Sequence, residues 1–153
     1  MRDLSRDDVV TWQRILNARG WSVANWPVEW GGTGWNITQR YIYDEEFGLA
    51  GAPMLPPFGP AMCASVLLRF GSEEQRQAIL PRIVKGECYF SIGMSEPDSG
   101  SDLASVRTRA EPVPGGFRVN GTKVWTSGAH RNHYCIALVR TSGQPGDRHK
   151  GLS

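Results

Sequence analysis

The hydrophobic period of the chain changes near residue 86, and this change constrains the fold more than any other feature. Before it, apolar residues recur every three or four positions, the spacing of one face of a helix. After it, apolar and polar residues alternate, which is typical of strands with one buried face. Helices followed by strands predict an α+β chain. We therefore expect an N-terminal helical domain over residues 1–86 and a β domain over residues 87–153.

Start and stop signals divide the helical half into four helices. Ser5 and Ser72 each begin a capping box, in which the serine hydroxyl accepts a backbone N–H that the first turn leaves free. Gly20 should end the first helix, because glycine readily adopts the left-handed conformation that follows a helix. The predicted helices run from Ser5 to Gly20, from Ile37 to Phe47, from Ala61 to Phe70 and from Ser72 to Pro81.

Two segments between these helices have no helical period. Residues 51–60 contain four prolines and are predicted to form a stiff connector. Residues 21–35 carry four of the six tryptophans and should form an ordered loop. We expect their rings to cover the apolar face between neighbouring helices, and direct contact with a ligand is the alternative.

Turn signals divide the second half into strands. Gly115-Gly116 and Asn120-Gly121 are dipeptides that predict two hairpins. The predicted strands cover residues 88–94, 105–111, 117–120, 122–126 and 134–141. Leu152 has the character of a further strand, and a sheet that stopped there would keep an unpaired edge. We therefore expect this chain to be a fragment or a truncated product.

Composition argues against several classes of function. The net charge is +2 and no stripe of Lys and Arg alternates with aromatic residues, so nucleic-acid binding is not expected. The sequence has no signal-peptide core and no apolar run long enough for a membrane span. Its three widely spaced cysteines favour reduced thiols in a cytoplasmic protein. His130 and His133 have no third ligand nearby in sequence, and no metal site is predicted.

Residues 94–103, here called the cradle loop, lie between two predicted strands and carry a run of hydroxyl groups. Pro97 and Gly100 predict a tight turn, in which successive N–H groups form a concavity that suits anions such as phosphate. A solvent-exposed loop held by its own Asx and serine turns is the alternative. A second segment places Trp125 beside two hydroxyl groups, where a flat ring could pack along a planar heterocycle.

Six elements, in order along the chain, resemble motifs of the acyl-CoA dehydrogenases. They are Trp30-Gly31-Gly32-Thr33-Gly34 with Pro27 before it, Gly71-Ser72-Glu73-Glu74-Gln75-Arg76, Leu80-Pro81, Gly86-Glu87, Met94 to Asp102, and Asn120-Gly121-Thr122-Lys123 with Trp125 and Ser127. The resemblance implies an N-terminal helical domain, a middle antiparallel β-barrel domain and a C-terminal helical bundle. This chain resembles most of the first domain and the opening strands of an incomplete second, and the bundle is absent.

The resemblance also implies a chemistry, in which FAD accepts a hydride from the β-carbon of an acyl-CoA thioester after a base removes the α-proton. The implied cofactor-binding residues are Ile92, Met94, Ser95, Ser101, Trp125, Thr126 and Ser127. Met94 and Ser95 would contact the pyrimidine side of the flavin, where donors stabilise the charge gained on reduction. Trp125 would pack beside the ring and Ser127 would bond near the reactive nitrogen. Ser101 would touch the thioester substrate or the phosphate region of the cofactor.

The sequence departs from the family pattern at three of these positions. The family usually has threonine where Ser95 and Ser127 stand, and serine keeps the hydroxyl but loses stiffness at χ1. An aromatic residue often stands at the position of Ile92, so a stacking role for Ile92 has no support. The family's catalytic base is usually a glutamate of the C-terminal bundle, and no catalytic residue is assigned in this chain. Glu96 lies in the flavin motif, but we expect it to stabilise the turn through an ion pair or hydrogen bond.

The leading hypothesis is an FAD-dependent acyl-CoA dehydrogenase, present as an N-terminal fragment that is inactive alone. The alternatives are a flavin monooxygenase or nitroalkane-oxidising relative on the same scaffold, or a non-catalytic truncated or accessory chain. The resemblance implies a protein electron acceptor such as an electron-transfer flavoprotein, and a homo-oligomer (dimer or tetramer). Straight-chain, branched, dicarboxylic and steroid side-chain thioesters all remain open as substrates. Without the bundle, the chain should bind FAD poorly and expose an apolar face that favours association.

Overall fold

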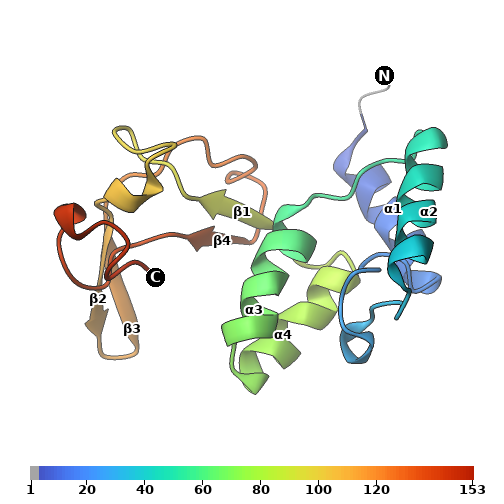
Figure 1. Cartoon of the computed structure of the whole chain (residues 1–153), viewed down its shortest axis with the longest axis horizontal. Coiled ribbons are helices and arrows are strands. Elements are labelled where there is room, and N and C mark those ends of the chain that lie inside the picture. The colour runs from blue at the N-terminus through green and yellow to red at the C-terminus, as the bar shows by residue number, and fades with distance from the viewer. Residues whose placement is uncertain (1–3) are drawn as a thin grey trace. The chain divides into compact units, whose positions relative to one another are not determined.

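The computed structural model describes residues 4–153, and residues 1–3 of the predicted helical domain lie outside the described part. The chain divides into two compact units, and the division falls between Tyr89 and Phe90. Of the described elements, all α-helices lie in the first unit and all strands in the second, here called the helical unit and the β unit (Figure 1). Within residues 4–153, no helix is long and apolar enough to cross a bilayer.

Most of the predicted helix boundaries follow from local capping. The helices are α1 (Arg6–Ala18), α2 (Ile37–Leu49), α3 (Ala64–Phe70) and α4 (Glu73–Val84). The predicted capping boxes at Ser5 and Ser72 are confirmed, and Asn36 forms a further box, unpredicted, at the start of α2. The predicted stop at Gly20 is also confirmed. Its φ is +72°, and its N–H donates to a carbonyl of the last turn of α1 at 2.9 Å.

Two helix boundaries differ from the prediction. A π-helical segment over Phe58–Cys63 precedes α3, so the helical turns begin before the predicted start at Ala61. Pro81 does not end α4 but lies inside it. The turn that follows contributes the buried Ile83 to the core, and burying such a side chain stabilises the fold by about 1.5–3 kcal/mol. Packing therefore outweighs the local proline signal.

Gln13 is a buried polar residue that connects distant parts of the helical unit. Its side-chain amide donates to the carbonyl of Ile83 at 2.6 Å and accepts from the hydroxyl of Tyr89 at 3.1 Å. The apolar side chains of Leu16 and Leu80 are buried as well. Because Gln13 interrupts the apolar pattern of α1, helical periodicity alone did not place it in the core.

The loop tryptophans pack over the helices, as predicted. Trp21, Trp35 and Tyr43 form a ring cluster with centroids 5.2, 6.0 and 6.1 Å apart. Trp26 is buried, and its indole N–H donates to a carbonyl of the proline-rich connector at 2.8 Å. These contacts hold residues 21–35 against α2 and the connector.

Many large apolar side chains of the helical unit are exposed. They include Ile37, Tyr41, Ile42 and Leu49 of α2, Met54 of the connector, and Met62, Val66 and Phe70 in and just before α3. The helix predicted over residues 61–70 is apolar nearly all round in sequence, yet within α3 only Ala64 is buried. The expected exposure of apolar surface is confirmed, and surface of this kind usually belongs to an interface.

The β unit contains β1 (Phe90–Gly93), β2 (Arg109–Val113), β3 (Gly116–Asn120) and β4 (Tyr134–Ala137). β2 and β3 form the predicted antiparallel hairpin, which turns before Gly116. β1 pairs with β4 in parallel, with Phe90 opposite Tyr134. The long segment between β1 and β4 acts as the crossover that parallel pairing requires. Within the described residues the strands form two two-stranded sheets, and a closed antiparallel barrel is not formed.

The strand predicted over residues 122–126 is wrong. Asn120-Gly121 does not return the chain along β3, because the N–H of Val124 donates instead to the carbonyl of Ser95 at 2.9 Å. Gly121 has φ +154° and passes so close to Thr108 that an added Cβ would lie 2.3 Å from its hydroxyl oxygen. The chain is therefore drawn across to the cradle loop by contacts that no short-range pattern encodes.

Candidate functional site

The cradle loop is held in shape by its own backbone. The N–H of Glu96 donates to the carbonyl of Ser99 at 2.7 Å, and the N–H of Ser99 donates back at 3.1 Å. The Ser99 hydroxyl donates to the carbonyl of Asp102 at 2.8 Å. Serine turns of the kind expected for a self-supporting loop are thus present. They use Ser99 and leave other hydroxyls of the loop available.

Glu96 is the buried centre of this loop. Its carboxylate accepts from Lys123 Nζ at 2.8 Å and from the backbone N–H groups of Arg107 and Thr108 at 2.7 and 2.9 Å. Burial alone would raise the pKa of Glu96, but these donors, Lys123 foremost, outweigh burial and lower the pKa to about 2. The carboxylate is therefore ionised and fully engaged, and the predicted turn-stabilising role of Glu96 is confirmed.

The second segment, residues 121–129, presents a strained and exposed aromatic ring. Trp125 has φ +58°, a left-handed conformation that costs a non-glycine residue about 1–3 kcal/mol. Its side chain is 87% exposed. The backbone on either side is fixed, because Val124 bonds to Ser95 and the carbonyl of Ser127 accepts from the buried Ser91 hydroxyl at 3.0 Å. Strain maintained by surrounding bonds is a frequent mark of functional segments.

Several hydrogen-bonding groups of the cradle loop and the second segment have no protein partner among the described residues. Within residues 4–153, the N–H groups of Ser95, Trp125 and Thr126 and the hydroxyls of Ser95, Thr126 and Ser127 donate to no protein acceptor. Backbone N–H groups are normally satisfied in folded proteins unless water or a ligand meets them. The two segments together therefore offer a flat ring beside open donors.

The structure places the predicted cofactor-binding residues in these two segments and the strand that precedes them. Ile92 lies half-buried in β1, Met94 and Ser95 follow it directly, Ser101 is exposed in the cradle loop, and Trp125, Thr126 and Ser127 lie in the second segment. The bond between Ser95 and Val124 brings the two segments together. Within residues 4–153, Ser101 makes no hydrogen bond to the second segment, so its predicted role near the substrate or phosphate stays a prediction.

Arg140 anchors the chain just after the cradle loop, and sequence reasoning missed it. Its side chain is 0% exposed, and its guanidinium donates to the carbonyls of Ala104, Val106, Arg148 and Lys150 at 2.7–3.2 Å. The available signal was a lone arginine at the end of an apolar run. Because its partners are backbone carbonyls, no residue type marked them in the sequence.

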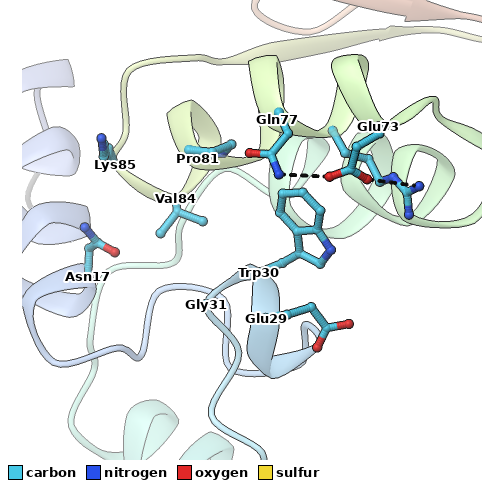
Figure 2. A pocket seen from close by; sticks show the side chains of 10 residues that line it. Asn17, Glu29, Trp30, Gly31, Glu73, Gln77, Pro81, Val84 and Lys85 are labelled. Atoms are coloured by element: carbon cyan, nitrogen blue, oxygen red, sulfur yellow. Dashed lines mark hydrogen bonds and ion pairs between the residues drawn. The ribbon is translucent and has the colours of Figure 1, made fainter.

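Two hollows lie among the described residues of the helical unit. One, of about 640 Å³, lies where Trp30 rests against α4, close to Gln77 and Glu73, with Lys85 and Asn17 at its other end (Figure 2). Its polar groups partly pair with one another, since Gln77 donates to Glu73 at 2.9 Å. The other hollow, of about 830 Å³, has a wall that includes Trp21 and Tyr43 of the ring cluster and residues of the proline-rich connector. In the described part of the chain, no three His, Cys, Asp or Glu side chains converge on a metal position.

Comparison with known families identifies the chain. The description "Acyl-CoA dehydrogenase, N-terminal domain" matches residues 2–87, and "Acyl-CoA dehydrogenase, middle domain" matches residues 91–153. The chain therefore belongs to the acyl-CoA dehydrogenase family, as its motifs suggested. Acyl-CoA dehydrogenase IpdE1 of Mycobacterium tuberculosis is 41% identical over 143 residues, which is 93% of this chain and 37% of that protein.

Solved structures of similar sequence have the same fold. The ChsE4-ChsE5 complex from Mycobacterium tuberculosis matches with a TM-score of 0.82 and 36% identity, over 97% of this chain and 37% of that one. The Tcur3481-Tcur3483 steroid ACAD matches with a TM-score of 0.81 and 36% identity, over the same shares of the two chains. This chain thus spans 37% of the length of these relatives.

Proposed function

We propose that this chain is part of an FAD-dependent acyl-CoA dehydrogenase, in which the β unit holds the flavin ring. The observation that carries the proposal is the exposed, strained Trp125 beside unpartnered donors of Ser95 and Thr126. A planar heterocycle with acceptors along one edge fits such a site, because the ring can pack against the indole while its edge takes the open N–H and hydroxyl groups. Isoalloxazine has this character, and FAD when bound would supply the hydride acceptor.

The residues of the chain would bind and orient the reactants. Donors at Met94 and Ser95 would stabilise negative charge at the edge of the flavin that they face, since they are already fixed by the cradle loop. The hydroxyls of Thr126 and Ser127 would contact the same ring from the second segment. Ser101 would bind the thioester or the phosphate groups of the cofactor. The residues 1–86 and 87–153 would then act as the substrate-covering and flavin-binding domains.

Removal of the α-proton requires a base that this chain does not supply at the cradle. Glu96 is the nearest carboxylate to the proposed site in sequence, but its oxygens accept three hydrogen bonds and its pKa lies at about 2. A carboxylate so strongly stabilised is a poor base near neutral pH. We therefore propose that the base lies outside residues 1–153 and that the chain alone is inactive.

The exposed apolar side chains of the helical unit support an assembled state for the complete enzyme. Side chains such as Leu49 and Phe70 are almost fully exposed, which is unfavourable for a free surface. We propose that these side chains are covered in a homo-oligomer, and that reduced flavin passes its electrons to an electron-transfer flavoprotein. One similar structure is a complex of two different proteins, ChsE4 and ChsE5, which supports assembly in general and makes a heteromer the alternative.

The substrate class that we favour is a thioester with a bulky acyl group. The apolar hollow of about 830 Å³ is large for a short straight chain and lies near the upper end of the usual range for small-molecule sites. One similar protein is described as a steroid ACAD. Thermal stabilisation of the chain by a steroid side-chain CoA thioester but not by butyryl-CoA would support this choice, and the reverse order would contradict it.

The flavin proposal is tested by titrating the purified chain with FAD and following flavin fluorescence. We expect weak binding, and Trp125→Ala should weaken it about tenfold, because one aromatic contact worth about 1.4 kcal/mol is lost. Phe117→Ala is the matched control, since Phe117 is also an exposed ring of the β unit but lies on the hairpin. Equal affinities for the two variants would refute the assignment of the flavin to Trp125.

A further inference from the structure

Lys123 joins the two segments that carry the proposed flavin contacts. Its Nζ donates to the carbonyl of Met94 at 3.0 Å and to the carboxylate of Glu96 at 2.8 Å. Met94 and Glu96 flank Ser95 in the cradle loop, and Lys123 lies two residues before Trp125. A single cation thus bonds to both neighbours of Ser95.

The pair is buried as well as close. The side chains of Lys123 and Glu96 are 14% and 7% exposed. The stem of Lys123 packs on β1, where an added Cβ at Gly93 would lie 3.3 Å from its Cγ. Breaking a buried pair leaves an uncompensated charge, so such a pair resists rearrangement more strongly than one in water.

A second set of contacts closes the arrangement from the other side. Glu96 also accepts from the N–H of Thr108, and Thr108 packs directly against Gly121 at the start of the second segment. The second segment is therefore fixed to Glu96 at two points. Gly121 is held through Thr108, and Lys123 bonds to the carboxylate directly. Trp125 lies two residues after Lys123, so these two contacts fix the position of its backbone.

We infer that Lys123 and Glu96 form a positioning pair, which holds the donors of Met94 and Ser95 at a fixed spacing from the Trp125 ring. The inference rests on the proposed flavin site and adds residues that do not themselves touch the cofactor. The pair fixes the two halves of the site before the ligand arrives, so binding does not have to order them.

The same loop provides a matched control. Asp102 of the cradle loop pairs with Arg148 at 3.0 Å, but these side chains are 54% and 62% exposed. An exposed pair is screened by water and adds little. Lys123→Met and Arg148→Met therefore each remove one cation bonded to a cradle-loop carboxylate, and only the first should disturb the site.

The experiment measures amide hydrogen exchange at Val124 together with FAD affinity in the 153-residue chain and these two variants. In Lys123→Met we expect Val124 to exchange at least about tenfold faster and FAD to bind at least about tenfold more weakly, a loss that one desolvated interaction can cause. In Arg148→Met both values should stay within about twofold of the unaltered chain. If Lys123 only stabilises the fold, Lys123→Met will unfold more easily but bind FAD normally while folded, and that result overturns the inference.

Two further outcomes separate the inference from the function on which it rests. FAD binding that is absent from the unaltered chain overturns the proposed flavin site. FAD binding that is present and equal in Lys123→Met and Arg148→Met overturns only the positioning pair. If Lys123→Met fails to fold, amide hydrogen exchange in the unaltered chain tests the positioning pair instead. The amides of Arg107, Thr108 and Val124 should open together and be slowed together by FAD, whereas three unrelated rates overturn the inference.

Discussion

Replacing Arg140 with methionine should destabilise the β unit severely, and the structure gives the size of the effect. Arg140→Met removes the donors to four carbonyls, of which those of Ala104 and Val106 are bonded in the buried interior. An unpaired buried acceptor costs about 1–3 kcal/mol, so these two cost about 2–6 kcal/mol. The carbonyls of Arg148 and Lys150 are only part-buried and can bond to water instead.

Removing the charge from the interior offsets part of this cost, because a buried guanidinium is itself expensive to desolvate. We therefore expect a net loss of about 3 kcal/mol in the free energy of unfolding. A unit the size of Phe90–Ser153 has a stability of about 3–10 kcal/mol, so much of it would be lost. At a urea dependence of about 1–1.5 kcal/mol/M, the unfolding midpoint should fall by about 2–3 M.

The assay is urea unfolding with amide exchange at Ala110 as the probe, since the N–H of Ala110 donates to the carbonyl of Arg140 at 3.0 Å. Arg118→Met is the control, because Arg118 is exposed on β3. If Arg140→Met and Arg118→Met unfold within about 0.5 kcal/mol of each other, the bonds of the guanidinium merely offset its own desolvation. That outcome would refute the reasoning.

Two other predictions concern titration and reactivity. The pKa of Glu96 falls from its usual 4.5 to about 2 on folding, so its charge contributes stability that is present above pH 4.5 and lost as the pH falls towards 2. Urea midpoints should therefore drop more steeply with acid in the unaltered chain than in Glu96→Gln, by about 3 kcal/mol in total, and parallel curves would contradict this. Burial raises the pKa of Cys63 to about 11 and also raises that of Cys88, while Cys135 is exposed. A thiol reagent near neutral pH should label Cys135 alone in the native chain, and rapid labelling of all three would show that the buried pair is accessible.

Sequence signals correctly predicted the features that depend on interactions between residues close together in the chain. The capping box at Ser5, the stop at Gly20 and the hairpin before Gly116 each depend on residues within a few positions of one another, and each is confirmed. The predicted end of a helix at Pro81 was wrong, because packing of the following turn against residues distant in sequence extends the helix past it. The strand at 122–126 was wrong because the N–H of Val124 bonds to a residue far back in the chain.

The candidate site also combines features that the sequence predicts with features that distant contacts decide. The turn-stabilising role of Glu96 was expected from its place in the flavin motif, and the structure supplies the donors. Arg140 could not be found, because backbone carbonyls carry no residue-type signal and its four partners lie in two segments far from each other in sequence. The positions of Met94, Ser95, Trp125 and the neighbouring hydroxyls came from motif resemblance, and their contacts with FAD stay predictions.

The parallel pairing of β1 with β4 has a consequence for the order in which the chain folds during synthesis. β2 and β3 are adjacent in sequence and can pair soon after they leave the ribosome, since short loops close quickly. β1 emerges earlier, but its partner is made only after the hairpin and the Trp125 segment have been translated. Its backbone edge and the ring of Phe90 stay unpaired for that interval, which makes β1 the strand most exposed to wrong association in the nascent chain.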